Sequence, residues 1–135
     1  MDGVPVPDHG GFPSLIGIEF PDSGEDWARA EVAVGDNLLQ PYGIVHGGVY
    51  SSIAETVCSK ATAEAVAGDG LLAFGQSNDA ALLRQISEGH IHAMARARHR
   101  GRSSWVWEVE ITDDEERLCA LVRLTIAVRP PPERS

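Results

Sequence analysis

The stretch QPYGIVHGGVYSSIAETVCSKATAEAV, residues 40–66, decides the fold of this chain. It begins with loop-forming residues. After Gly48 neither glycine nor proline recurs before Gly68, and alanine is abundant. A glycine directly after a helical run is a common C-cap. The stretch therefore predicts one long helix over residues 48–67, about 30 Å in length at 1.5 Å per residue.

The predicted helix carries small side chains on nearly all of its circumference. With about 100° of rotation per residue, one side presents Val49, Ile53 and Val57. Another side groups four polar residues, namely Ser52, Glu55, Ser59 and Thr62. Because small side chains let other backbone pack closely, we expect a sheet to wrap around this helix.

Glu55 lacks a basic neighbour on this predicted helix. A surface helix usually places Lys or Arg three or four positions from a glutamate. Here those positions hold Ser51, Ser52, Cys58 and Ser59. Either Glu55 faces solvent, or a group outside its own helix holds it in place.

Much of the remaining chain alternates apolar and polar residues, which is typical of half-buried strands. Residues 12–20 predict a helical turn followed by a strand, and further strands are predicted at 28–34, 71–83, 90–100, 103–111 and 117–128. Short turns join the last three strands and predict an antiparallel meander. In the last two strands one face carries Trp105, Trp107, Val109 and Ile111, then Leu118, Ala120, Val122, Leu124 and Ile126. The pattern predicts an α+β domain, an antiparallel sheet curled around one long helix.

The predicted domain covers residues 12–129. Residues 1–11 are rich in Gly, Pro and Asp, which predicts a flexible N-terminal arm. The segment RPPPERS ends the sheet because proline cannot continue a ladder, so residues 130–135 are predicted to be a tail. We find no internal repeat and no second domain in the sequence.

Composition excludes several classes of function. The chain of 135 residues has 20 acidic and 11 basic side chains and a net charge of −9, which argues against binding nucleic acid. There is neither an apolar run of the roughly 20 residues that span a bilayer nor a signal peptide, so we expect a cytoplasmic protein without a membrane partner. No Cys/His spacing resembles a zinc site, and we expect no metal and no cofactor. No serine lies in a GxSxG nucleophile elbow, which argues against an α/β-hydrolase.

Four arginines nevertheless alternate within seven positions, beside His99: Arg96, Arg98, Arg100 and Arg102. On an acidic chain, a local cationic strip favours one specific anion over a polyanion. The alternative is a solvated strand face, and the spacing alone leaves both open.

The segment NLLQPYGIVHGGVYSSIAETVCS resembles the active-site segment of hotdog-fold acyl-CoA thioesterases. The nearest branch contains the phenylacetate-pathway, 4-hydroxybenzoyl-CoA and 1,4-dihydroxy-2-naphthoyl-CoA thioesterases. An HGG motif opens the helix at His46, with Gln40 six positions before that histidine and Glu55 nine positions after it. The likeness runs from about residue 12 to 128 and includes Arg84, five residues before Gly89, and the His99-x-Gly101-Arg102 segment.

This resemblance implies a hotdog fold and hydrolysis of an acyl-CoA thioester. It implies homodimers with a continuous sheet, often paired into homotetramers, and an active site shared between subunits. Gln40, His46 and Gly47 would come from one chain and Glu55 from the other. The face that carries Trp105 and Trp107 also needs cover, which is a second reason to expect a homo-oligomer.

The resemblance also assigns roles to residues. Glu55 would be the nucleophile or the general base, and the Gly47 backbone N–H would polarise the thioester carbonyl. Gln40 and His46 would be polar aids, and Ser59 would assist the water or the carboxylate. The expected contacts of the CoA phosphates are Arg84, Arg102, Ser103 and Ser104. Cys58 is expected in the core.

Two other functions remain open from the sequence. The chain could hydrolyse thioesters on acyl carrier protein, or it could be a non-catalytic hotdog module that binds acyl-CoA. A hotdog dehydratase would need an Asp/His pair that we do not find.

Overall fold

The computed structural model of the protein describes residues 11–133. The predicted N-terminal arm therefore lies outside the described residues except for Gly11, as do the last two residues of the predicted tail. The elements, in chain order, are α1 (Phe12–Ile16), β1 (Ile18–Glu19), β2 (Trp27–Ala33), η1 (Asp36–Leu38), α2 (Gly47–Val66), η2 (Ala67–Asp69), β3 (Leu72–Leu82), β4 (His90–Arg100), β5 (Ser104–Thr112) and β6 (Leu118–Arg129).

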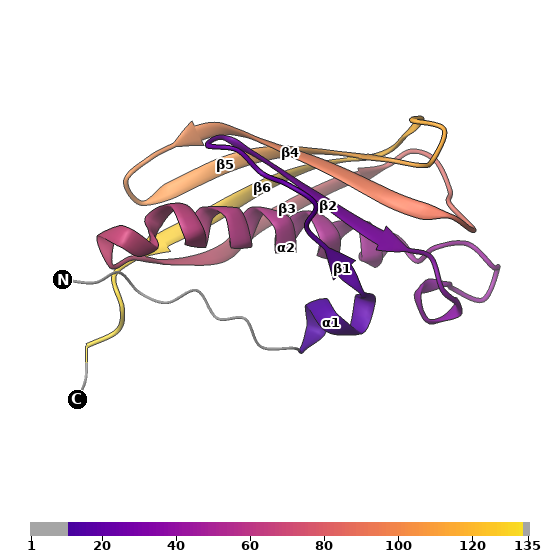
Figure 1. Ribbon diagram of the computed structural model, residues 1–135, viewed down its shortest axis with the longest axis horizontal. Coiled ribbons are helices and arrows are strands. Elements are labelled where there is room, and N and C mark those ends of the chain that lie inside the picture. Colours follow the sequence, from indigo (N-terminus) through magenta and orange to yellow (C-terminus); the bar gives the residue numbers. More distant parts are fainter. Residues whose placement is uncertain (1–10, 134–135) are drawn as a thin grey trace.

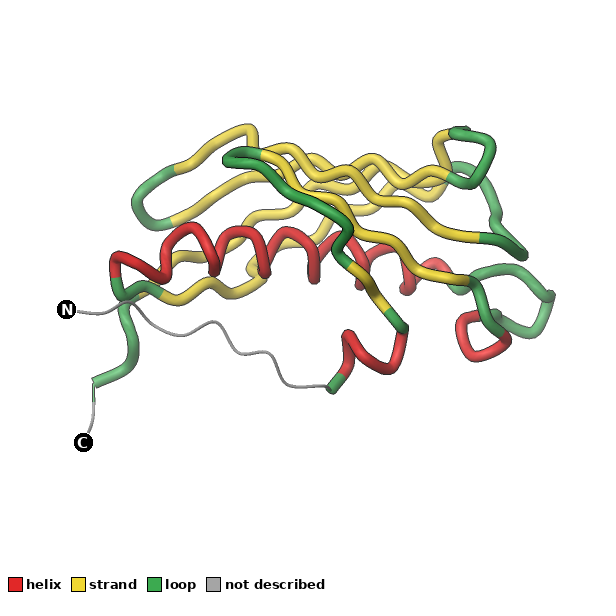
Figure 2. Tube along the Cα trace, in the orientation of Figure 1, coloured by secondary structure: helices red, strands yellow, loops and turns green. Residues whose placement is uncertain are grey.

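The six strands form one antiparallel sheet in the order β1-β2-β4-β5-β6-β3. The meander predicted from the last three strands is confirmed by the pairing of β4 with β5 and of β5 with β6. The sheet curls over one side of α2, so the molecule has a strand layer and a helix layer (Figures 1 and 2). None of the helices within residues 11–133 is long and apolar enough to cross a membrane.

Helix α2 begins one residue earlier than predicted, at Gly47, and ends at Val66. The expected C-cap at Gly68 is wrong. The chain tightens into the 3₁₀ turn η2 first, and Gly70 adopts the left-handed conformation that ends it, with φ 73° and ψ 23°. Glycine adopts this conformation without steric cost, whereas a side chain at that position would be strained.

The core lies between α2 and the sheet. From β5, Trp105 and Trp107 point into it with their rings stacked at 5.9 Å, and they are 5% and 1% exposed. The expectation that this face needs a second copy for cover is therefore wrong, because the chain covers it with its own helix.

Thr62 does not share the polar side of α2 predicted from the helical wheel. It is fully buried, and its hydroxyl donates to the Cys58 carbonyl at 2.7 Å and accepts from Trp107 Nε1 at 2.9 Å. The sheet extends far enough around the helix to enclose this position. The hydroxyl satisfies an indole N–H that would otherwise be buried without a partner.

Leu118 was predicted on the apolar face of β6 but is 40% exposed. The register explains the difference. Ile111 pairs with Ala120 and Thr112 pairs with Leu118, so Cys119 is an extra residue, and a β-bulge lies at this end of the strand. A bulge shifts the alternation by one position, and Cys119 is buried in place of Leu118.

Strand β3 is an edge of the sheet and the most solvent-exposed of its long strands. Among the strands of residues 11–133 it pairs with β6 alone, and most of its residues are exposed. It also contains a bulge, because Gly75 and Ser77 pair with the adjacent residues Ile126 and Thr125, which leaves Gln76 unpaired. Along its length β3 packs beside α2, so this open edge and the helix together frame the candidate site.

Candidate active site

A short loop fixes Gln40 and His46 in front of α2. The loop is closed by a bridge between Leu39 and Val45 and by a hydrogen bond from His46 N to Leu38 O at 2.9 Å. Gly43 makes the turn possible with a φ of 80°, and its N–H donates to Gln40 O at 2.9 Å. Gln40 Oε1 accepts from the Tyr42 N–H at 3.2 Å. Since a backbone N–H can only donate, the amide nitrogen of Gln40 is left to donate elsewhere.

His46 is the N-cap of α2. Its Nδ1 accepts from the Gly48 N–H at 2.9 Å, which satisfies one of the free donors at the helix N-terminus. An Nδ1 that accepts a hydrogen bond carries no proton, so a neutral ring holds its proton on Nε2. His46 is exposed and therefore offers an N–H donor to solvent or to a ligand.

Gly47 is the first helical residue, and among residues 11–133 no group accepts a hydrogen bond from its N–H. The neighbouring donors are occupied, because Gly48 N bonds His46 Nδ1 and Val49 N bonds His46 O. The positive end of the helix dipole adds to the attraction of negative charge at this point. Leu82 covers the glycine, since a Cβ placed at Gly47 would lie 2.5 Å from Leu82 Cδ1.

Glu55 is exposed and faces β3. Its Oε1 accepts from Asn78 Nδ2 at 3.3 Å, and a Cβ placed at Gly75 would lie 2.7 Å from Oε2. Glu55 has no basic neighbour on its own helix, and its contacts within the chain come from strand β3. This answers in part what holds Glu55 in place. Sequence reasoning missed Gly75, Asn78 and Leu82, and the only signal was the polar centre of an otherwise apolar strand.

One chain does not bring the predicted catalytic residues together. Gly47 and Glu55 are eight residues apart on the same helix, which separates them by about 12 Å along its axis. Ser59 lies one turn beyond Glu55 and is half-buried. Gln40, His46 and Gly47 thus form one group at the helix N-terminus, and Glu55 and Ser59 form another near its middle.

The predicted CoA-binding residues are also divided. Arg84 N donates to Cys119 O at the start of β6, whereas Ser103 O accepts from Val128 N at its end. Cys119 and Val128 are nine positions apart in the strand, which corresponds to about 30 Å. Arg102, Ser103 and Ser104 lie together at the turn that joins β4 to β5, where the Gly101 N–H donates to Ser104 O at 2.9 Å.

The arginine strip separates into paired and unpaired members. Arg98 Nε bonds Glu108 at 2.8 Å, while Arg100 lies 3.6 Å from Glu25 and stacks over the Trp105 ring at 4.6 Å. The positive charges of Arg98 and Arg100 are therefore accounted for by ion pairs within the chain. Within residues 11–133, Arg84, Arg96 and Arg102 form no ion pair.

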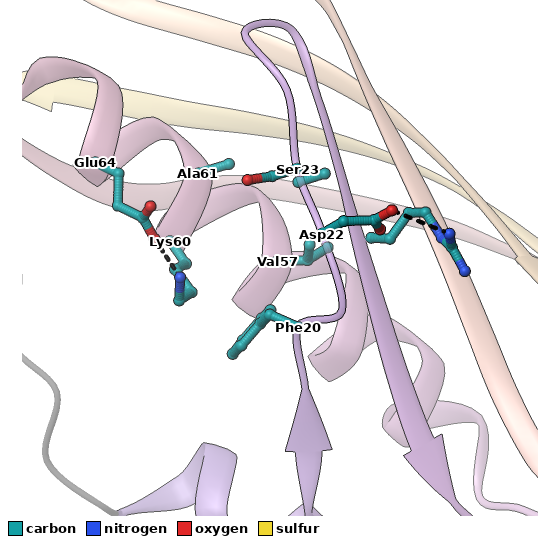
Figure 3. A pocket seen from close by; sticks show the side chains of 9 residues that line it. Phe20, Asp22, Ser23, Val57, Lys60, Ala61 and Glu64 are labelled. Carbon is teal, nitrogen blue, oxygen red and sulfur yellow. Dashed lines mark hydrogen bonds and ion pairs between the residues drawn. The ribbon is translucent and has the colours of Figure 1, made fainter.

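A small cavity of about 90 Å³ lies on the other side of α2, against the segment between β1 and β2 (Figure 3). Its charged side chains pair with each other: Lys60 with Glu64, and Arg29 with Asp22 at 3.3 Å. The helical period places Val57 and Ala61, which line it, opposite Glu55. This cavity is therefore separate from the candidate site.

Cys58 lies in the core, as predicted, and is fully buried. Burial, with a smaller contribution from the Glu55 charge, raises the pKa of its thiol. A thiol that resists ionisation is a poor nucleophile, so Cys58 is not a candidate nucleophile of this site.

Comparisons with known proteins identify the family of the chain. The family model of the thioesterase superfamily matches residues 42–120. A 1,4-dihydroxy-2-naphthoyl-CoA hydrolase of Listeria monocytogenes is 36% identical over 119 residues, 88% of this chain and 96% of the relative. The proofreading thioesterase EntH of Cronobacter turicensis is 34% identical over 113 residues, 84% of this chain and 82% of the relative.

The fold agrees as well. The crystal structure of a thioesterase from Haemophilus influenzae superposes with a TM-score of 0.84 at 35% identity, covering 90% of this chain and 85% of the other. The curled six-stranded sheet over one long helix is the architecture predicted from the resemblance. The chain therefore belongs to the thioesterase superfamily, as a hotdog-fold thioesterase.

Proposed function

We propose that the protein hydrolyses an acyl-CoA thioester to a free acid and CoA, in a site that two copies of the chain build together. One observation carries the proposal. A single α2 presents at Gly47 an N–H that no group within residues 11–133 accepts and, about 12 Å along the axis, the Glu55 carboxylate, held beside the edge strand β3.

Pairing of two β3 edges would build this shared site, and the position of β3 at the edge of the sheet supports such pairing. A two-fold axis through the middle of an antiparallel β3 pair reverses the strand ends. The end of β3 that carries Leu82 and covers Gly47 then lies beside the start of the second copy's β3. The same reversal carries Arg84 toward the end of the second copy that holds the Arg102–Ser104 turn. Both divided groups of predicted residues are thereby reunited.

The reaction uses the two halves for different tasks. The thioester oxygen accepts from the Gly47 N–H, which stabilises the negative charge that develops as the carbonyl carbon is attacked. Glu55 of the other copy either attacks that carbon or takes a proton from the water that does. The C–S bond then breaks and CoA leaves as the thiolate. If Glu55 is the nucleophile, water next hydrolyses the acyl anhydride on Glu55, which releases the free acid and restores the carboxylate. If Glu55 is the base, water has already formed the free acid, and the proton held by Glu55 passes to the thiolate or to solvent. Gln40 and the Nε2–H of His46 supply further donors near the carbonyl, and Ser59 assists at the carboxylate.

The CoA moiety is assigned to Arg84, Arg102, Ser103 and Ser104. Guanidinium groups bind phosphate oxygens through paired N–H donors, and the arginines offered here are not engaged in ion pairs within residues 11–133. The name of the Listeria relative, a hydrolase of an aromatic CoA ester, supports a CoA substrate.

The test is Glu55→Gln, which keeps the size of the side chain but removes its charge and basicity. We expect kcat to fall by at least about 10²-fold, with KM little changed because the CoA contacts lie elsewhere. Thiol release from a panel of acyl-CoAs measures the kinetics, and a thermal melt confirms the fold. Turnover near that of the wild type in a folded Glu55→Gln protein would remove Glu55 from the mechanism.

The same panel, extended with acyl carrier protein thioesters, separates the alternative functions. Release from acyl carrier protein thioesters but not from CoA esters would identify a carrier-protein thioesterase. Binding of acyl-CoA without release from any ester would identify a non-catalytic binding module.

A further inference from the structure

Gly75 and Asn78 both face Glu55, although three positions apart in a regular strand they would point to opposite faces of the sheet. The bulge at Gln76 accounts for this. Gly75 pairs with Ile126 and Asn78 pairs with Leu124, and both partners point into the core. Because the extra residue shifts the alternation by one, Asn78 points inward like Gly75. The bulge thereby places both residues next to the Glu55 carboxylate.

Gly75 supplies space for the carboxylate. A Cβ at this position would lie 2.7 Å from Glu55 Oε2 and 2.8 Å from its Cδ. Both distances are shorter than packed atoms tolerate. The φ of Gly75 is not in the left-handed region, so its backbone conformation does not require glycine. The missing Cβ is what lets the Glu55 carboxylate lie this close to the strand.

Asn78 supplies orientation. Its Nδ2 donates to Ser51 O on α2 at 3.0 Å and to Glu55 Oε1 at 3.3 Å. Both partners can only accept, so the amide nitrogen must face them and its two hydrogens can serve one acceptor each. The bond to the helix backbone anchors the amide, and the second bond holds one oxygen of Glu55.

We propose that the β3 bulge forms a cradle for the Glu55 carboxylate, with Gly75 and Asn78 as positioning residues for the hydrolytic reaction. The inference rests on the proposed role of Glu55. Asn78 holds Oε1, and within residues 11–133 Oε2 accepts no hydrogen bond, which leaves that oxygen to meet the thioester carbon or the water. A single orientation of the carboxylate shortens the search for the reactive geometry, and displacement by about 1 Å can reduce a rate about 10²-fold.

Three variants test the cradle. Asn78→Ala removes the donor, and we expect kcat to fall by about tenfold or more with KM within about twofold. Gly75→Ala pushes the carboxylate away from the strand and should reduce kcat in the same way. The matched control is Asp79→Asn. Asp79 is adjacent in the strand but faces the opposite side, opposite Arg123, so this variant should keep the wild-type kcat.

Asn78→Asp supplies a readout that a purely structural role would not move. It places a second carboxylate beside Glu55, and two neighbouring carboxylates share a proton. The acid limb of kcat against pH should therefore move to higher pH. Cys58 is the titratable neighbour on α2, and Asp79 on β3 faces away. An acid limb in its wild-type position would count against the cradle, as would a folded Asn78→Ala protein with kcat within twofold of the wild type.

The outcome for Glu55→Gln separates this inference from the proposed function. If Glu55→Gln is inactive and Asn78→Ala is fully active, the function stands and the cradle is overturned. If Glu55→Gln is fully active, the role of Glu55 is overturned and the cradle with it. Should Gly75→Ala fail to fold, the two Asn78 variants decide.

Discussion

Gly47 lacks a side chain at the point where Leu82 covers the helix N-terminus. We propose two separate roles for this position: an N–H that a ligand approaches closely, and a space that Leu82 fills. The Leu82→Ala background separates them, because it removes the atom that a Cβ would strike.

In that background, Gly47→Ala retains the N–H and Gly47→Pro removes it. Proline is well tolerated at the first helical position, and His46 before it has the extended conformation that proline requires, with ψ 133°. We expect kcat of the proline variant to lie about 10²–10³-fold below that of the alanine variant. Steady-state kinetics measure the difference, and circular dichroism checks the helix. Equal kcat values would show that the Gly47 N–H does not stabilise the transition state.

At the scale of elements, one buried hydrogen bond ties α2 to β5. Thr62→Val keeps the shape of the side chain but leaves the Trp107 indole N–H without its acceptor at 2.9 Å. We expect the free energy of unfolding to fall by about 1–3 kcal/mol, the cost of an unsatisfied buried donor. Urea denaturation measures this loss. An unchanged unfolding midpoint would mean that another acceptor replaces the threonine.

The turn between β5 and β6 is stabilised by Asp113. Hydrogen bonds from Arg117, first from its backbone N–H at 3.0 Å and then from its side chain, hold the pKa of the Asp113 carboxyl below its usual value. A depressed pKa in the folded chain contributes stability above the unfolded value of about 4, and that stability is lost as pH falls through the folded pKa. Asp113→Asn should therefore be less stable than the wild type at pH 7. The difference between their urea midpoints should shrink as the buffer is taken below pH 4, whereas a constant difference would contradict the assignment.

Element by element, the predictable parts of the fold were those with a regular period. Alternation identified the strands, and the run without glycine or proline identified α2. Leu118 and Thr62 were misplaced for two physical reasons: a bulge shifts the alternation by one residue, and a curved sheet encloses more of a helix than a helical wheel shows. A bulge also explains why the sequence did not predict Asn78 as a neighbour of Glu55. In a regular strand without the bulge at Gln76, Asn78 would face away from Glu55. The motif predicts Gly47 and Glu55 as candidate site residues, and their separation on one helix follows from the rise per residue alone.

At the scale of the whole molecule, the edge strand β3 and the division of the candidate site both lead us to expect a second copy of the chain. An exposed edge strand of 11 residues is a template for pairing with another chain, and two copies paired there would complete both sites.

The prediction concerns dimers that contain one Glu55→Gln chain and one Gly47→Pro/Leu82→Ala chain, isolated through two different affinity tags. If each site takes Gly47 from one chain and Glu55 from the other, one site of the mixed dimer carries both lesions and the other carries neither. Such dimers should recover about half of the wild-type activity, although each variant alone is inactive.

The complementary experiment pairs a wild-type chain with a chain that carries all three substitutions. A shared site then places a lesion in both sites of the mixed dimer, so its activity should be lost. Sites built within single chains give the opposite pair of results: no activity in the first mixture and about half in the second. Light scattering on each purified mixture confirms that dimers are being measured. The two mixtures contain the same substitutions in total. A difference in activity between them therefore reports whether each site takes Gly47 and Glu55 from one chain or from two.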